Sequence, residues 1–328
     1  MDFNMFCNIV KEKIVDYLPP EQDYSVDLIT TKKNNCEKVG LCIKKNDDVF
    51  APNIYLESFY DSYNNSGCDI EDALNNISIT YAESVDEKNI NVPSDELLSR
   101  IGDKDYILEN VYINLLNNID NAERLADIPS ISVDGMNDIS GIFRVMVSND
   151  ENGRASYVLN NKHIALLGMS VDDLKEVALA NTERMYQPTV RSLNDILIEM
   201  GMPDFMLPPE NESPMYFIGG TNKDVGGAVS ILFKDNLAKL SDKLDSDLIL
   251  IPSSIHEFLA VPDSLNMSVA EISDMVQEIN CTEVAVEDRL SNNVYKFSKK
   301  DMSISKVTDV NKNLKGESMT FFVDSKNL

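Results

Sequence analysis

The stretch LILIPSSIHEFLAVP, residues 248–262, joins two apolar runs through two serines, a histidine and a glutamate. Pro252 has no amide hydrogen to give to a sheet, so the first run should end as a strand close to it. Ser253 and Ser254 favour a turn, because their hydroxyls form hydrogen bonds with the nearby backbone. The stretch therefore predicts a strand–turn–strand corner.

Other strand pairs surround this corner in the sequence. YSVDLITT (24–31) and KVGLCIKK (38–45) flank a polar linker, and IFRVMVS (142–148) and ASYVLN (155–160) flank NDENGR, with a turn expected at Asn152–Gly153. Single helices are expected between such pairs, without the regular alternation of a doubly wound fold. This order predicts an α+β fold with a helix-rich N-terminal lobe that carries a small hairpin. The C-terminal lobe should hold a mixed or antiparallel sheet covered by helices.

Helix signals accompany these strands. Apolar residues recur at helical spacing from Phe3 until Pro19–Pro20, and serine N-caps precede the segments that begin at Val171 and Val269. The stripe of Leu108, Val111, Tyr112, Leu115, Ile119, Ala122 and Ala126 predicts a further helix within 93–128.

A small, polar stretch, SISVDGMND (130–138), is interpreted as the boundary between two domains. The prediction is an acidic, helix-rich α+β lobe at 1–130 and a sheet lobe at 131–328. The tail after about residue 311 is expected to fray.

Negative charge dominates the chain, with 55 acidic against 29 basic residues and a net charge of −26. Residues 61–130 alone carry 15 acids and four bases. Such a field opposes a phosphate backbone, so no direct nucleic-acid binding is expected. The acidic segment is either a solvated surface or a docking surface for a basic protein partner.

Five scattered cysteines without a C-x-x-C pair and only two histidines give no metal-site pattern, so neither a metal nor a cofactor is expected. The cysteine usage is typical of a reducing compartment. The N-terminus does not resemble a secretory signal, and no apolar run has the length of a membrane span. These features predict a cytoplasmic protein that does not enter a membrane.

The candidate site lies at the opening corner, at Ser253, Ser254, His256 and Glu257. A serine and a histidine on one face could act as nucleophile and base, but the chain has no G-x-S-x-G elbow, so no catalytic residue is assigned. The glycine-rich loop IGGTNKDVGG (218–227) lacks the spacing of a phosphate-binding loop. It is interpreted as a hairpin loop that leads into a strand, GAVSILF (227–233).

The order of segments also resembles a known family. VGLCIKKNDDVFAPNIYLESFYDSY (39–63), the run from Phe143 to Met185 and the corner at 248–262 are similar to an uncharacterised domain-of-unknown-function family of gut Clostridia, often found near mobile-element genes. The helix GMSVDDLKEVALAN (168–181) also resembles, more distantly, another uncharacterised bacillar family. No catalytic residues are established for the first family, so the resemblance assigns none here. The resemblance implies a bacterial cytoplasmic accessory of a mobile element.

Together these features favour a non-catalytic protein that binds a basic partner, such as a host-defence nuclease, through its acidic segment. The alternative is a hydrolase or small-ligand-binding protein with a site at the 252–258 corner. The sequence indicates neither an oligomeric state nor a ligand.

Overall fold

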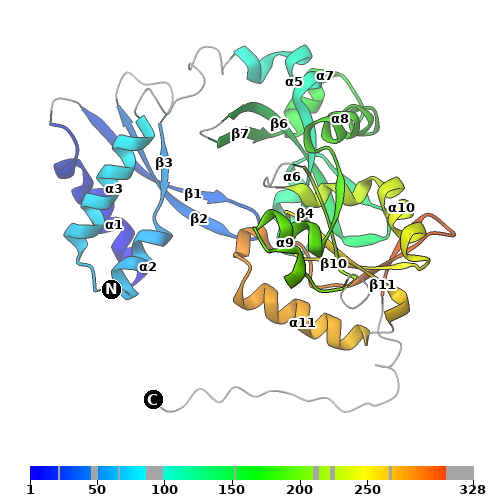
Figure 1. The fold of residues 1–328 in the computed structure, drawn as a ribbon. Coiled ribbons are helices and arrows are strands. Elements are labelled where there is room, and N and C mark those ends of the chain that lie inside the picture. Colours follow the sequence, from blue (N-terminus) through cyan, green and yellow to red (C-terminus); the bar gives the residue numbers. More distant parts are fainter. Residues whose placement is uncertain are drawn as a thin grey trace, which may run out of the picture.

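The computed structural model of the chain describes residues 1–20, 23–45, 51–65, 67–85, 99–150, 153–209, 214–221, 226–265 and 268–307. Two lobes are built around separate hydrophobic cores, one formed by residues 6–81 and a larger one by residues 107–304. In Figure 1 the smaller lobe, coloured blue to cyan, lies beside the larger lobe. Strands β1 and β2 extend from the smaller lobe toward the larger one (Figure 1).

The N-terminal lobe packs helices on a three-stranded antiparallel sheet of order β1-β2-β3. Buried side chains of α1 recur at Phe6, Cys7 and Val10, so one face of this helix meets the sheet. The elements are α1 (Phe3–Lys13), η1 (Ile14–Tyr17), β1 (Tyr24–Lys32), β2 (Glu37–Lys45), β3 (Asn53–Tyr55), α2 (Glu57–Asn65) and α3 (Ile70–Val85).

The larger lobe contains two sheets. A six-stranded sheet has the order β13-β12-β10-β11-β9-β8, and a second sheet has the order β4-β6-β5 with β7 paired to β6. Its strands are β4 (Val111–Asn117), β5 (Ser130–Val133), β6 (Met136–Asp150), β7 (Gly153–Val158), β8 (Thr189–Ser192), β9 (Tyr216–Gly219), β10 (Leu248–Pro252), β11 (Phe258–Pro262), β12 (Tyr295–Ser298) and β13 (Ser303–Lys306).

Helices and short 3₁₀ turns connect these strands. They are α5 (Lys104–Asn110), α6 (Ala122–Asp127), α7 (Asn161–Leu167), α8 (Val171–Tyr186), α9 (Leu193–Glu199), η2 (Asp204–Met206), η3 (Gly227–Leu232), α10 (Lys234–Leu244), η4 (Asp263–Leu265), α11 (Val269–Thr282) and η5 (Val286–Asp288). The serine caps are confirmed: the Ser170 side chain accepts from the amide of Asp173, and that of Ser268 from the amide of Glu271. With antiparallel pairing in each sheet of the described residues, the predicted α+β fold is confirmed.

The strand–turn–strand prediction for 248–262 is confirmed, because β10 and β11 pair antiparallel with Leu248 opposite Pro262. All five residues of β10 are buried. Leu248 and Leu250 belong to the main core, whereas Ile249 and Ile251 pack with Ile272 of α11 on the other face. A strand covered on both faces needs a continuous apolar sequence, which explains the run LILIP.

Two element predictions are wrong. Residues 111–117 lie within the predicted helix of 93–128 but form strand β4, in which Val111, Tyr112 and Ile113 are all buried. A strand covered on both faces has apolar residues at every position. Some of these residues then also recur at helical spacing, and the pattern resembles the apolar face of a helix. Similarly, GAVSILF forms the 3₁₀ helix η3 and not a strand. The part of the predicted helix at 93–98 lies outside the described residues.

The stretch SISVDGMND, expected to be a domain boundary, forms the β5–β6 hairpin with Asp134–Gly135 at its turn. Gly135 has φ +77° and lies against Ile304 of β13, where a Cβ atom would come within 1.7 Å of the carbonyl oxygen. Because β4 pairs with β6, a division at residue 130 would cut through one sheet. Asp-Gly between apolar runs is a strong hairpin signal that could have indicated this turn.

The β6–β7 hairpin is confirmed, although the expected turn residue Asn152 and the tail after about residue 311 lie outside the described residues. Within the part of the chain that is described, no helix combines the length and the apolar character needed to cross a membrane.

Candidate functional site

The predicted corner residues come together on one wall of a cavity. Ser254, His256 and Glu257 line a cavity of about 480 Å³, together with Arg191 of β8 and Glu199 of α9. Ser253 is half-buried in the same turn but lies outside this lining. Three of the four candidate residues therefore line the same cavity, and their role as binding residues stays a prediction.

The geometry of the corner does not make a serine–histidine pair. Ser254 Oγ accepts a hydrogen bond from the main-chain nitrogen of His256 at 3.0 Å, which fixes the turn. The imidazole is engaged elsewhere: its Nδ1 accepts from the amide of Gly226 at 3.3 Å, and its Nε2 lies 3.5 Å from a carboxylate oxygen of Asp288. The ring is thus oriented by Asp288 and Gly226, and not toward the hydroxyl of Ser254.

Glu257 is the chemically distinctive member of the corner. Burial raises the pKa of its carboxyl, and the nearby charges of Arg191 and His256 partly offset this effect. Arg191 itself pairs with Glu199 at 3.0 Å. Side chains of both charges therefore line this cavity, so it favours neither an anionic nor a cationic ligand.

A second cavity, of about 370 Å³, is lined by three arginines, and we call it the arginine pocket. It lies against one face of the β4–β6–β7 part of the smaller sheet of the larger lobe. Its lining residues are Lys33, Asn34, Tyr112, Asn114, Leu115, Arg124, Ile142, Arg144, Arg154, Ser156, Ile255, Glu287 and Asp288.

Strand periodicity places most of these groups on the same face. Tyr112 and Asn114 are two residues apart on β4, as are Ile142 and Arg144 on β6 and Arg154 and Ser156 on β7. The registers set Tyr112 opposite Arg144 and Asn114 opposite Ile142. Side chains two residues apart point to the same side of a sheet, so the wall of the pocket follows directly from this pairing.

Arg144 is held in a fixed orientation by Ser156. Its Nε and Nη2 donate to Ser156 Oγ at 3.1 and 2.9 Å, and Nη2 also donates to the carbonyl oxygen of Ser156. Tyr112 donates its hydroxyl to the same Oγ at 3.2 Å. Neutral partners therefore position this guanidinium without cancelling its charge.

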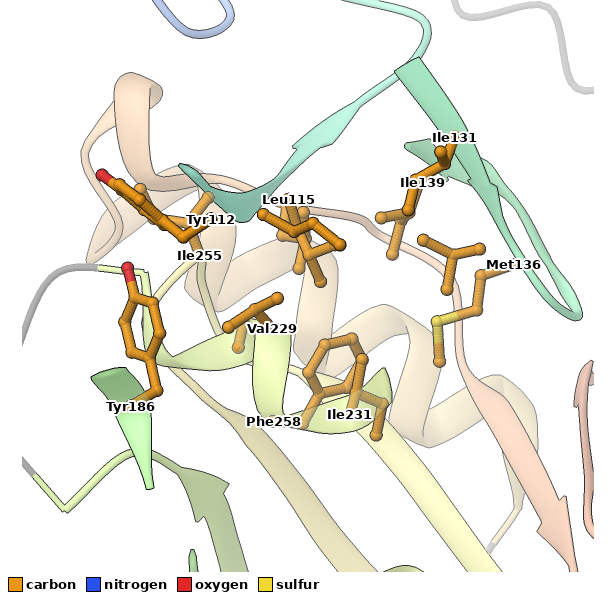
Figure 2. Close-up of a cluster of buried hydrophobic side chains, with 14 of the residues drawn as sticks. Tyr112, Leu115, Ile131, Met136, Ile139, Tyr186, Val229, Ile231, Ile255 and Phe258 are labelled. Carbon is orange, nitrogen blue, oxygen red and sulfur yellow. The ribbon is translucent and has the colours of Figure 1, made fainter. Parts of the chain in front are cut away.

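Arg154 and Tyr186 form the second part of the wall. Arg154 Nη1 donates to the hydroxyl of Tyr186 at 3.2 Å, and its guanidinium lies 5.4 Å from the ring centroid. Figure 2 shows Tyr112 and Tyr186 at one end of the main core, with both hydroxyls directed away from the apolar side chains. Burial raises the pKa of Tyr186 by more than Arg154 and Arg144 lower it. The phenol therefore stays neutral.

Arg124 of α6 carries the least compensated charge. It forms no hydrogen bond or ion pair with another residue of the described chain. Burial, followed by repulsion from Arg144, lowers the pKa of its guanidinium. A half-buried cation beside a second cation is costly unless an anion joins them.

Two carboxylates lie at the rim of the pocket. Glu287 forms an ion pair with Lys38, whereas Asp288 lies 3.5 Å from His256 Nε2, which neutralises it only when the imidazole is protonated. In addition, Asn114 Oδ1 is buried and has no hydrogen-bond partner within the described structure. The pocket thus offers the guanidinium groups of Arg124 and Arg144, neither of which forms an ion pair with a described carboxylate.

Sequence reasoning missed this pocket. Arg144 interrupts the apolar run IFRVMVS, and a charge on a half-buried strand is a signal that could have pointed to it. Arg124 gives no such signal, because it lies on a short helix among other charged residues. Only the fold brings α6, β6 and β7 together.

The acidic segment 61–130 divides between the two lobes. Residues 61–85 belong to α2 and α3, whereas 99–127 run through α5, β4 and α6, and Figure 1 shows these two groups on different lobes. Eleven of its 15 acidic residues are described and all are exposed: Asp61, Asp69, Glu71, Asp72, Glu83, Asp103, Asp105, Glu109, Asp120, Glu123 and Asp127.

Among the described residues, no group of three or more His, Cys, Asp or Glu side chains could hold a metal ion. Fold and site define an α+β protein with antiparallel sheets and an arginine-lined cavity. A family model described as a family of unknown function, DUF5688, matches residues 3–299, so the chain belongs to this family. No curated protein and no solved structure matches the chain.

Proposed function

We propose that this protein is a binding protein whose arginine pocket takes a small oxyanion. The observation that carries the proposal is Arg124, a half-buried guanidinium without a counter-charge, next to Arg144. In a chain with 55 acidic residues, carboxylates to neutralise it are plentiful, yet no described carboxylate forms an ion pair with Arg124, and Glu287 at the rim pairs with Lys38. An anionic ligand would supply the missing charge.

The chemistry of the lining favours a phosphate or carboxylate compound. The planar guanidinium groups match the paired oxygens of either anion. A cavity of about 370 Å³ lies in the range of small-molecule sites. The net charge of −26 disfavours a long polyanion in this place.

Calorimetric titration with inorganic phosphate, ribose 5-phosphate and citrate tests the proposal. At least one of these anions should bind, and Arg144→Ala should weaken its binding by about tenfold or more, because a charge-assisted bond contributes about 1.5–3 kcal/mol. Arg184→Ala is the matched control, since Arg184 bonds the exposed Glu109 carbonyl away from the pocket. The proposal would be overturned if the protein bound none of the three anions. It would also be overturned if Arg144→Ala and Arg184→Ala bound an anion equally well.

We propose a second role on a separate observation, the exposure of all eleven described acids in 61–130. In this role a cytoplasmic accessory protein of a mobile element docks a basic partner, such as a host-defence nuclease. The likeness to a family often found near mobile-element genes motivates the partner class. Residues 61–85, which lie mostly in α2 and α3, contain no Lys or Arg, whereas residues 99–127 contain three, so α2 and α3 are favoured as the contact surface.

This second role predicts a salt-sensitive complex. A basic partner recovered from a host lysate should be lost as salt rises from 50 to about 500 mM, because exposed charges are screened. The double variant Asp61→Asn/Glu71→Gln should retain less of it than the wild type, whereas Asp105→Asn/Glu109→Gln in the larger lobe should retain it fully. A complex indifferent to salt would contradict the proposal.

A further inference from the structure

The tip of the β1–β2 hairpin, residues 32–38, joins the N-terminal lobe to the larger lobe. Asn35 is central to the contact and has φ +60°. Its amide donates to Asn121 Oδ1 at 3.0 Å, and Asn121 Nδ2 donates back to Asn35 Oδ1 at 2.7 Å. Its own Nδ2 donates to the carbonyl oxygens of Val286 and Arg289 at 2.8 and 2.6 Å.

Ion pairs surround this amide contact. Lys32 pairs with Glu123 at 2.5 Å, and Lys38 pairs with Glu287. Asn34 Nδ2 also donates to the carbonyl oxygen of Glu287 at 2.7 Å. The tip is therefore seated on α6 and η5, two elements that also border the arginine pocket.

The same tip forms one wall of the pocket. Lys33 and Asn34 line it opposite the arginines of the larger lobe. The Lys33 ammonium lies 4.5 Å from the ring centroid of Tyr55, and its charge lowers the pKa of Glu287, which lines the same pocket. Docking the tip therefore adds a fourth cation to the three arginines, beside the carboxylates of Glu287 and Asp288.

We propose that the hairpin tip completes the anion site, with Lys33 as a ligand-binding residue, so that ligand binding and docking of the N-terminal lobe strengthen each other. This inference rests on the proposed function of the arginine pocket. Without a ligand, the amide contacts and ion pairs hold the tip in place. An anion bound between Lys33 and the arginines attracts both walls of the pocket, and thermodynamic linkage makes the effects of ligand binding and docking reciprocal.

Lys33→Ala tests the direct contribution. With whichever of inorganic phosphate, ribose 5-phosphate or citrate the wild type binds, the variant should bind at least about fivefold more weakly, the lower end of typical coupling factors. Lys44→Ala is the matched control, because Lys44 lies exposed on the same hairpin but far from the tip.

Asn35→Gly tests the coupling, since Asn35 does not line the pocket and glycine accepts a φ of +60°. The variant should also bind about fivefold more weakly. In the wild type, the ligand should slow hydrogen exchange of the amides of Asn35 and Cys36, which belong to the docked tip.

The outcomes separate the two proposals. If the wild type binds none of the anions, the function of the pocket is overturned. If the wild type binds and Arg144→Ala abolishes binding, but Lys33→Ala and Asn35→Gly bind as tightly as the wild type, only the role of the hairpin tip is overturned.

Discussion

Replacing Asp138 by alanine should lower the free energy of unfolding by about 3 kcal/mol, because three donors would lose a shared half-buried carboxylate. Tyr295 donates its hydroxyl to Asp138 Oδ1 at 2.6 Å, and Asn293 Nδ2 and Ser291 Oγ donate to Oδ2 at 2.7 and 2.5 Å. Tyr295 is fully buried in the main core, so its hydroxyl could not turn to solvent. Urea denaturation at pH 7 measures the loss.

The same carboxylate should make stability depend on pH. Burial raises the pKa of Asp138, but the hydrogen bonds from Ser291, Tyr295 and Asn293 together outweigh it, and the net pKa lies below the usual value of an aspartate. A depressed folded pKa means that the stabilisation is complete above the unfolded pKa and declines as the pH falls through the folded one.

Asp138→Asn provides the test of this pH dependence. Its amide cannot titrate, so the loss of stability between pH 6 and pH 3 should be smaller than in the wild type, although the variant is less stable at pH 7. Asp103→Asn serves as the control, because Asp103 is an exposed helix cap away from the core. Equal acid sensitivity of Asp138→Asn and the wild type would contradict the assigned role.

Arg124→Met should have opposite effects on stability and on binding. Methionine fills a similar volume without charge, so the unliganded protein should gain about 1 kcal/mol, as is common when an unfavourable functional group is removed. Anion binding should fall by about tenfold or more, because the guanidinium facing Arg144 is lost. Thermal unfolding without ligand and calorimetric titration measure the two effects.

This pair of measurements distinguishes a ligand-binding arginine from a structural one. Arg184 provides the comparison, because its Nη2 donates to the carbonyl oxygen of Glu109 at 2.9 Å, away from the pocket. Arg184→Met should therefore lower stability, by about 1 kcal/mol for the lost hydrogen bonds, without changing anion binding. A stability loss in Arg124→Met would show that Arg124 is needed for the fold.

Patterns within short stretches of sequence predicted those hairpins and helices that depend on neighbouring residues. The hairpins β1–β2 and β10–β11 and the serine-capped helices α8 and α11 follow from alternation, turn residues and caps. Strand β4 escaped prediction because it is buried on both faces, and its length of seven residues fits either a strand or two turns of a helix. Its partner β6, more than twenty residues away, decides between them.

The two cavities differ in how far the sequence could reveal them. The corner residues Ser254, His256 and Glu257 are neighbours in the chain, so a local pattern drew attention to them. The arginine pocket depends on the register of β4, β6 and β7 and on the seat of a distant hairpin. No local pattern specifies such a convergence.

Because the chain is synthesised from its N-terminus, the two lobes can fold at different times. The smaller core is complete by Tyr81, so the first lobe can fold on the ribosome while most of the other is still unmade. The seat for Asn35, however, includes Val286 and Arg289, which emerge some 250 residues later. Chains released early would therefore have a folded first lobe in which the exposed tip of the β1–β2 hairpin lacks its contacts with the larger lobe.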